Sequence, residues 1–334
     1  MRRSFKTICS FAAFFSLLIS AANAQKTNGK QEIKVPSNYT APIFQNSTGL
    51  QTILESSIDQ VLASFPSGTF NKSDISATLI DLREPNKIEM AELTGEKRIY
   101  PASVVKMFYM AALERQLEDG KIMLTPELTR GLRDMIVDSS NEATQYILDV
   151  VTDTSSGAEL PQKKFNNWQY KRDRVNRFFA AMGYRNINAN QKTFCEDAYG
   201  IEQQSRKYKG ENRNMLTTNA VARLLTEIVL GRMNTPERTK IMMDLMKRDP
   251  FAATKDEEDQ AHGFIGKALV DKKLAGAKLW SKAGWTSSTR HDAAYVETPD
   301  GLKFVLVIFT ENHATQREAI PGIAGEIIDK LRMN

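Results

Sequence analysis

Strand signals occur near both ends of the chain and are almost absent from about residue 104 to 250. The first two strand-like segments are separated by a turn at 84–86 and predict a β-hairpin, and the last two are joined by a turn at 299–301. The strand-like segments are 74–81, 87–93, 277–282, 292–298 and 303–310. The simplest arrangement is one sheet built from both ends of the chain, with the middle inserted as a separate lobe.

Helical periodicity fills the middle of the chain and flanks the strands. The segments with this period are 49–65, 104–118, 126–137, 141–151, 168–182, 220–230, 236–247 and 316–331. Residues 183–214 show no clear period, and a loop of that length is usually functional or mobile. We therefore expect an α+β fold: an antiparallel sheet with flanking terminal helices (47–100 and 270–334) and an inserted all-helical lobe (101–269). A site is expected between the lobes.

Residues 1–24 have the composition of a targeting segment. Arg2, Arg3 and Lys6 precede an apolar run, and Ala22-Asn23-Ala24 has the small-x-small form of a cleavage site. This pattern predicts a signal peptide cleaved near Ala24 and an exported protein, periplasmic or secreted. An uncleaved N-terminal anchor is the alternative. Residues 25–46, rich in Lys, Asn, Gln, Ser and Pro, are expected to form a flexible leader, and 47–334 the folded domain.

The mature chain is nearly neutral. The signal peptide contains three of the 45 basic residues and none of the 40 acidic residues. The mature chain therefore has 42 basic and 40 acidic residues. We see no dense basic run interleaved with aromatic residues and expect no nucleic-acid partner. Cys195 is the single cysteine after cleavage, which excludes an intrachain disulfide. The three histidines lack metal-ligand spacing, so no metal or cofactor is expected. We expect a monomer without a stable membrane span.

Ser103 and Lys106 fall at the start of the helical segment 104–118. Unpaired backbone N–H groups and the helix dipole favour developing negative charge there. Lys106, three residues on, projects from the same face as Ser103. A buried lysine that loses its proton can activate such a serine as a nucleophile. The same residues also fit an ordinary N-cap followed by a solvated lysine.

Two further segments of the sequence support a catalytic role for Ser103 and Lys106. Ser103-x-x-Lys106 is followed by Ser139-Ser140-Asn141 in a polar loop before a helix, and by Lys282-Ala283-Gly284 on a strand. This order resembles the S-x-x-K, S-D-N and K-T-G motifs of class A β-lactamases and penicillin-binding proteins. The resemblance covers about 49–332 and implies the β-lactamase/transpeptidase-like fold.

The resemblance also implies roles. Ser103 would attack an amide carbonyl, with Lys106 accepting its proton, and backbone N–H groups of Ser103 and the strand at 282–286 would stabilise the oxyanion. Ser139, helped by Lys282, would protonate the leaving nitrogen. Further binding roles are implied for Asn141 (the substrate's side-chain amide), for Gly284, and for Lys282 with Arg290 (a substrate carboxylate).

The sequence also departs from the family pattern. Ala283 replaces the usual hydroxyl residue of the third motif, for which Thr286, or Ser287 and Ser288, would substitute. No Glu-x-x-Leu-Asn motif occurs in 183–212, where Glu196 and Glu202 are the candidates for the water-activating base. Without such a base an acyl-enzyme would form and persist.

Three functions follow from these observations. The first is an exported serine hydrolase that opens a β-lactam amide through acyl-Ser103. The second is a D-alanyl-D-alanine peptidase, transpeptidase or esterase on the same scaffold, acting on a cell-wall peptide with slow deacylation. The third is a non-catalytic relative that binds peptidoglycan or a protein.

Overall fold

The computed structural model describes residues 32–194 and 197–333. The predicted signal peptide and the candidate base Glu196 lie outside the described residues. Seven strands form a sheet in the order β1-β3-β2-β8-β7-β5-β4, and β6 also pairs with β7. The strands are β1 Phe44–Asn46, β2 Ile75–Asp81, β3 Ile88–Leu93, β4 Lys247–Arg248, β5 Lys278–Ser281, β6 Gly284–Trp285, β7 Arg290–Glu297 and β8 Lys303–Thr310.

Strands from the two ends of the chain meet at the centre of the sheet. β2 pairs antiparallel with β8, with Leu79 opposite Leu306, and β8 pairs antiparallel with β7. Successive β8 side chains enter different cores, since Leu306 packs with the helices below the sheet and Val307 with the helical lobe above it. Burial of both faces explains why β8 reads as a continuous apolar run. The predicted sheet from both chain ends is confirmed.

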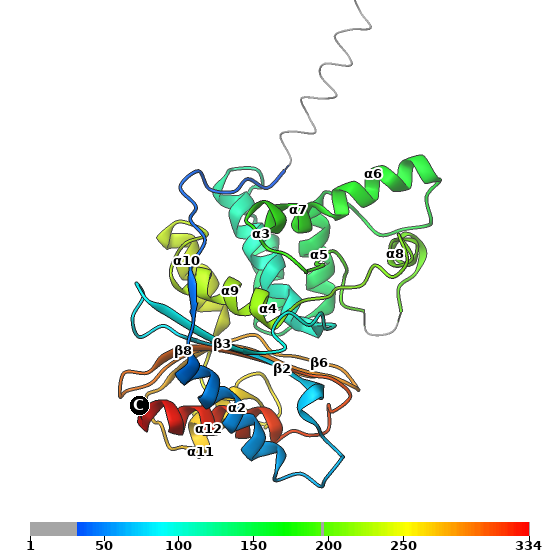
Figure 1. Cartoon of the computed structure of the whole chain (residues 1–334). Helices are drawn as coiled ribbons and strands as arrows, with labels where there is room; N and C mark the ends of the chain where they lie inside the picture. Colours follow the sequence, from blue (N-terminus) through cyan, green and yellow to red (C-terminus); the bar gives the residue numbers. More distant parts are fainter. Residues whose placement is uncertain (1–31, 195–196, 334) are drawn as a thin grey trace, which may run out of the picture.

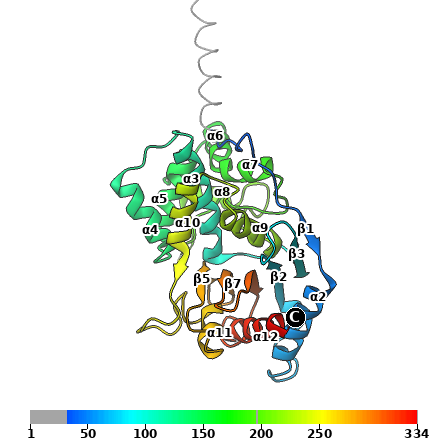
Figure 2. The same cartoon turned by 90° about the vertical axis from the view of Figure 1, so that its left-hand side faces the viewer.

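Three helices cover the lower face of the sheet (Figures 1 and 2). They are α2 Thr48–Leu62, α11 Ile265–Asp271 and α12 Ala319–Met333. Ile58 of α2 and Ile327 of α12 share a core with Leu269 of α11. The expected boundary of the helical lobe at residue 269 is corrected, because residues 265–269 lie in α11, which packs in the α/β layer. A helix this short shows no period in the sequence.

The other face of the sheet carries the inserted helical lobe (Figure 1). Its helices are α3 Lys106–Glu118, α4 Pro126–Ile136, α5 Asn141–Thr152, α6 Gln162–Arg172, α7 Arg174–Ala181, α8 Gly200–Arg206, α9 Thr218–Val229 and α10 Pro236–Met246. Residues 106–117 of α3 are all buried, so this helix is the axis of the lobe. Within the described ranges, no helix has the length and apolarity needed to cross a membrane.

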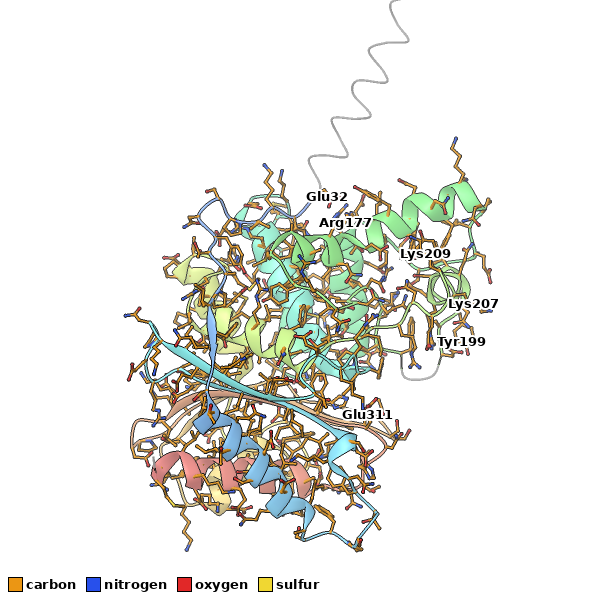
Figure 3. All side chains as sticks on the ribbon, in the orientation of Figure 1. Glu32, Arg177, Tyr199, Lys207, Lys209 and Glu311 are labelled. Atoms are coloured by element: carbon orange, nitrogen blue, oxygen red, sulfur yellow. The ribbon has the colours of Figure 1, made fainter. Side chains whose placement is uncertain are left out.

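Two local predictions are corrected by the structure. The expected helix over 168–182 is divided at Asp173, whose φ of −80° and ψ of 9° end α6 and precede α7. The last three residues of the expected flexible leader form β1, which runs parallel to β3. Before β1, Ile33 is buried, and Glu32 forms an ion pair with Arg177 of α7 across 2.7 Å (Figure 3).

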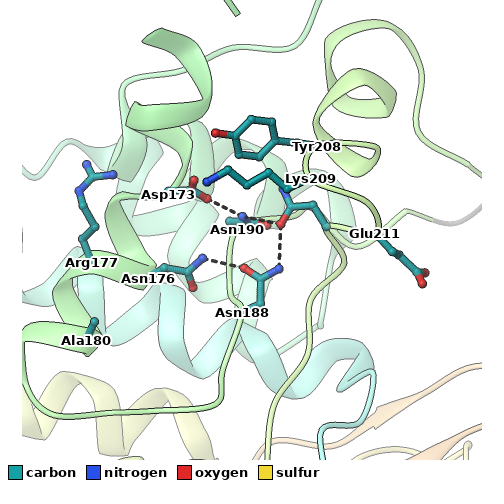
Figure 4. Close-up of a pocket in the computed structure, with 10 residues that line it drawn as sticks. Asp173, Asn176, Arg177, Ala180, Asn188, Asn190, Tyr208, Lys209 and Glu211 are labelled. Carbon is teal, nitrogen blue, oxygen red and sulfur yellow. Dashed lines mark hydrogen bonds between the residues drawn. The ribbon is translucent and has the colours of Figure 1, made fainter. Parts of the chain in front are cut away.

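The long segment 183–214 is held by side-chain amides around a hollow of about 430 Å³ (Figure 4). Asn176 of α7 donates to Asn188 (2.7 Å), and Asn188 donates in turn to Asn212 (2.8 Å). Asn190 donates to Asp173 (2.6 Å) and to Asn212 (3.0 Å). These bonds hold the irregular part of the segment, because buried polar groups need partners. The expectation that 183–214 has no regular structure is corrected by α8, which lies within it.

Candidate active site

Ser103 lies in a short 3-10 helix, Ala102–Val105, that leads directly into α3. Ala102 before it has a φ of +46°, a left-handed conformation that costs a non-glycine residue roughly 1–3 kcal/mol. Ser103 is partly exposed, whereas Val104, Val105 and Lys106 are buried. The turn therefore presents the hydroxyl at the surface of the lobe and sends the lysine inward.

Lys106 is fully buried, and its ammonium is bonded to the loop before α5. Nζ donates to the Ser139 carbonyl (2.5 Å), to Ser139 Oγ (3.2 Å) and to Asn141 Oδ1 (2.9 Å). Ser139 has a φ of +57°, which turns its carbonyl and its hydroxyl toward the lysine. The first and second motifs thus form one hydrogen-bonded group, although 33 residues separate Lys106 from Ser139.

Lys282 brings the third motif to the same hydroxyl from the sheet side. It follows β5, and its Nζ donates to Ser139 Oγ (3.0 Å) and to the Ala283 carbonyl (2.8 Å). Burial lowers the pKa of the Lys282 ammonium well below its usual range, and the nearby charges of Lys106 and Arg248 lower it further, while Asp292 acts in the opposite direction. Ser139 Oγ is therefore shared by two lysine amines.

Gly284 allows the sheet to approach the start of the serine turn. A Cβ at this position would lie 2.7 Å from the Ser103 nitrogen and 2.9 Å from the Pro101 carbonyl oxygen. Contacts this short are sterically forbidden, so only glycine brings β6 beside the Ser103 N–H. The arrangement suits an oxyanion site built from backbone donors of the two segments.

Two residues that we did not predict complete the site. Thr193 donates to Asn141 Oδ1 across 2.6 Å, so the segment 183–214 reaches the second motif. Gln260 accepts from the Lys282 ammonium and from the Ala283 N–H (3.2 Å) and donates to the Val137 carbonyl (3.0 Å). Both lie in segments without a period or a motif, and no sequence signal identified them.

Comparison with known families agrees with this geometry. The model of the beta-lactamase enzyme family matches residues 53–331, most of the chain. The chain belongs to this beta-lactamase family. A search of curated proteins found no match. The predicted resemblance is confirmed, and the chain has the scaffold of a beta-lactamase-family serine hydrolase or penicillin-binding protein.

Solved structures of beta-lactamase-family proteins share the fold. One is a beta-lactamase from Sphaerobacter thermophilus, at 20% identity and a TM-score of 0.58, covering 85% of this chain and 98% of its own. A class A beta-lactamase from Bacteroides cellulosilyticus has 16% identity and a TM-score of 0.59, covering 85% and 99%. A mutant of PBP-A, an acyl-enzyme complex with penicillin G, has 16% identity and a TM-score of 0.59, covering 88% and 100%.

Glu202, one of the two predicted bases of this family member, lies in a buried ion network of the helical lobe. Its Oε1 accepts from Arg172 (2.8 Å) and from Ser156 Oγ (3.0 Å) and lies 3.3 Å from Lys192 Nζ. Asp149 on α5 also pairs with Arg172 (2.8 Å). The network joins α5, α6 and α8 through Glu202 Oε1, while Glu202 Oε2 is buried and has no hydrogen-bond partner among the described residues.

Arg290 and Thr286, the expected substrate contacts on the sheet, are bonded within the protein. Arg290 is buried and donates to Glu258 (2.7 Å) and to the Gly263 carbonyl (2.6 Å). Thr286 Oγ1 accepts from the Thr289 N–H (3.1 Å) inside the turn between β6 and β7.

His291 supports the serine turn from β7. Its Nδ1 accepts from the Thr310 N–H (3.2 Å), so the neutral ring carries its proton on Nε2, which donates to the Tyr100 carbonyl (3.0 Å). Burial lowers the pKa of His291 to about 4. The ring therefore stays neutral in the folded protein near neutral pH. His291 thus links β7 and β8 to the segment that precedes Ser103, through the Tyr100 carbonyl.

Proposed function

We propose that this protein is an exported serine hydrolase of the class A type that opens a β-lactam amide through an acyl-Ser103 intermediate. The observation that carries the proposal is the hydroxyl of Ser139, which lies 3.2 Å from Lys106 Nζ and 3.0 Å from Lys282 Nζ. This arrangement supplies a path for a proton from the attacking serine to a leaving nitrogen.

In the proposed reaction Lys106 reacts as the neutral amine: Ser103 Oγ attacks the amide carbonyl carbon while Lys106 Nζ accepts the Ser103 proton. Backbone donors of Ser103 and β6 stabilise the oxyanion. Ser139 gives its proton to the leaving nitrogen as the carbon–nitrogen bond breaks, and the proton held by Lys106 restores the Ser139 hydroxyl. Lys282 holds the Ser139 oxygen in place, and its lowered pKa favours transfer of a proton within the group. Asn141, fixed by Lys106 and Thr193, would contact the substrate's side-chain amide.

Slow deacylation on a cell-wall D-alanyl-D-alanine peptide is the second candidate. Its support is the position of Glu202, whose Oε1 is bonded to Arg172 and Lys192 in a buried ion network of the helical lobe. A threonine, Thr193, contacts Asn141 from the segment where a water-activating glutamate is expected. Both observations favour an acyl-enzyme that accumulates.

The test mixes the mature chain with a penicillin and follows ring opening by absorbance and intact-protein mass over time. Repeated turnover with a short-lived adduct supports the β-lactam hydrolase, and a lasting adduct supports the slow peptidase. The absence of both ring opening and adduct contradicts either acyl-enzyme function and leaves the non-catalytic binder. Export is tested separately by the mass of the secreted product, which should begin at Gln25.

A further inference from the structure

The groups expected to hold a substrate carboxylate are bound to acceptors of the protein itself. Lys282 is the first. An ammonium has three N–H donors, and Nζ donates to Ser139 Oγ, to the Ala283 carbonyl and to Gln260 Oε1. Among the described residues these three acceptors match the donors of the ammonium, so a substrate carboxylate would have to displace one of them.

Gln260 is held beside Lys282 by two further hydrogen bonds. Its side chain is buried, and its amide nitrogen donates to the Val137 carbonyl across 3.0 Å. Its oxygen also accepts from the Ala283 N–H across 3.2 Å. The carboxamide therefore bridges the helical lobe and the third motif, and its oxygen takes up one donor of the Lys282 ammonium.

Nη2 of Arg290 is likewise bonded to internal acceptors, whereas its Nε is buried without a hydrogen-bond partner among the described residues. Its guanidinium stacks 3.9 Å from the centre of the Phe264 ring and pairs with the Glu258 carboxylate and the Gly263 carbonyl. Glu258 is also paired with Arg317 across 3.1 Å. The side chain of Arg290 is only 6% exposed. An internal carboxylate thus takes the place beside Arg290 that the sequence assigned to the substrate.

The Thr286 hydroxyl, one of those expected to replace the hydroxyl missing at Ala283, is also bonded internally. Thr286 Oγ1 accepts from the N–H groups of Ser288 and Thr289, both at 3.1 Å. These bonds form the turn that connects β6 to β7, and they hold the Thr286 hydroxyl within that turn.

From these contacts of Lys282, Arg290 and Thr286 we propose that the substrate carries no carboxylate beside the amide that Ser103 opens, and that a neutral acyl donor, an ester or amide at that position, is preferred. Glu258 and Gln260 set this preference. The inference rests on the proposed acyl-Ser103 chemistry. Ser103 Oγ gains the acyl carbon, the carbon–nitrogen bond breaks, and the nitrogen receives a proton, for a free acid and for its ester alike. The acylation rates of the free acid and the ester therefore differ only through the way the site recognises the group beside the amide.

The test measures the second-order rate constant of acylation, by intact-protein mass, for a penicillin and for its methyl ester. The proteins are the wild type, Glu258→Gln, Gln260→Leu and the matched control Glu257→Gln, which removes an exposed charge from the neighbouring residue. We expect the wild type to react faster with the ester. Glu258→Gln and Gln260→Leu should each raise the acid-to-ester ratio about tenfold, the size of one charge-assisted hydrogen bond, and Glu257→Gln should leave the ratio unchanged.

Each other outcome has a distinct meaning. A wild type that reacts faster with the free acid overturns the inference and leaves the proposed function intact. An ester preference that neither Glu258→Gln nor Gln260→Leu alters overturns the assignment to Glu258 and Gln260. No adduct from either compound overturns the proposed function and this inference with it. The wild-type ratio decides the substrate class even if a variant fails to fold.

Discussion

Lys282 Nζ donates a hydrogen bond to Ser139 Oγ across 3.0 Å, and this contact joins the sheet to the helical lobe at the active site. The two residues are 143 positions apart in the sequence. Their meeting depends on the sheet being closed by strands from both ends of the chain. The same hydroxyl receives Lys106, so one oxygen connects all three motifs.

Replacing Ser139 with alanine should slow acylation of Ser103 by about 10²- to 10⁴-fold, the usual contribution of a positioned proton donor. The variant removes the hydroxyl shared by Lys106 and Lys282. Stopped-flow kinetics with a penicillin measure the effect. Ser140→Ala is the control, because Ser140 Oγ caps α5 by accepting from Ala143 N–H. Its loss should lower stability by about 1 kcal/mol and change acylation little. Equal acylation rates in the two variants would contradict the assignment of Ser139.

Gly284→Ala should impair acylation more than it impairs folding. Its Cβ would stand 2.7 Å from the Ser103 nitrogen, so β6 and the serine turn must separate. We expect acylation to fall at least about tenfold, since overpacking costs about 1–3 kcal/mol and acts here on the oxyanion donors. Gly301→Ala, in an open turn between β7 and β8, is a control for backbone strain alone. An unchanged acylation rate in Gly284→Ala would show that this approach is not needed.

Glu202→Gln should destabilise the helical lobe, because it leaves Arg172 and Lys192 with only Asp149 as a carboxylate partner. Breaking a buried pair costs about 3–5 kcal/mol, and urea unfolding measures the change. Glu211→Gln, whose side chain is 74% exposed, should stay within about 0.5 kcal/mol of the wild type. A Glu202→Gln protein of full stability that loses its acyl group more slowly would instead identify Glu202 as the water-activating base.

His291 makes stability depend on pH. Burial lowers its folded-state pKa to about 4, while an unfolded histidine titrates near about 6.5. As the pH falls from about 6.5 to about 4 the unfolded chain binds a proton that the folded chain does not, and the wild type loses about 3 kcal/mol from this group. Burial raises the pKa of Asp292 to about 6, which opposes the loss over much of the same range because the folded state binds that proton first.

The His291→Gln variant separates these two effects, because it retains Asp292. The free energy of unfolding of the wild type minus that of the variant should fall as the pH is lowered through this window. Urea unfolding at pH 7, 6, 5 and 4 gives the difference at each pH. A difference that does not change with pH would mean that His291 is protonated equally in both states.

The sequence predicted the parts of the site that rest on regular structure. Ser103 and Lys106 begin a buried helix, Asn141 begins another, and Lys282 follows a strand, so the motif spacings fix their neighbours. Gln260 and Thr193 lie in irregular segments, where side-chain contacts depend on the path of the chain in space and not on any period. The internal partner of Arg290 was missed for the same reason, since Glu258 lies in the segment that holds Gln260.

Fold prediction failed where the elements are short or are broken locally. β1 has three residues and α11 has seven, too few for periodicity to be visible. The break between α6 and α7 at Asp173 leaves the apolar pattern nearly unchanged, so one helix was expected there. By contrast β8 and α9, with eight and twelve residues, were predicted to within about two residues at either end.

The most direct test of the account is the location of the acyl group. After reaction with a penicillin the protein is digested, and the modified peptide is fragmented in a mass spectrometer, with Ser103→Ala treated in parallel. We predict that the added mass lies on Ser103 and that the variant gains none. An adduct on another residue, or one that persists in Ser103→Ala, would contradict the central claim that Ser103 is the nucleophile.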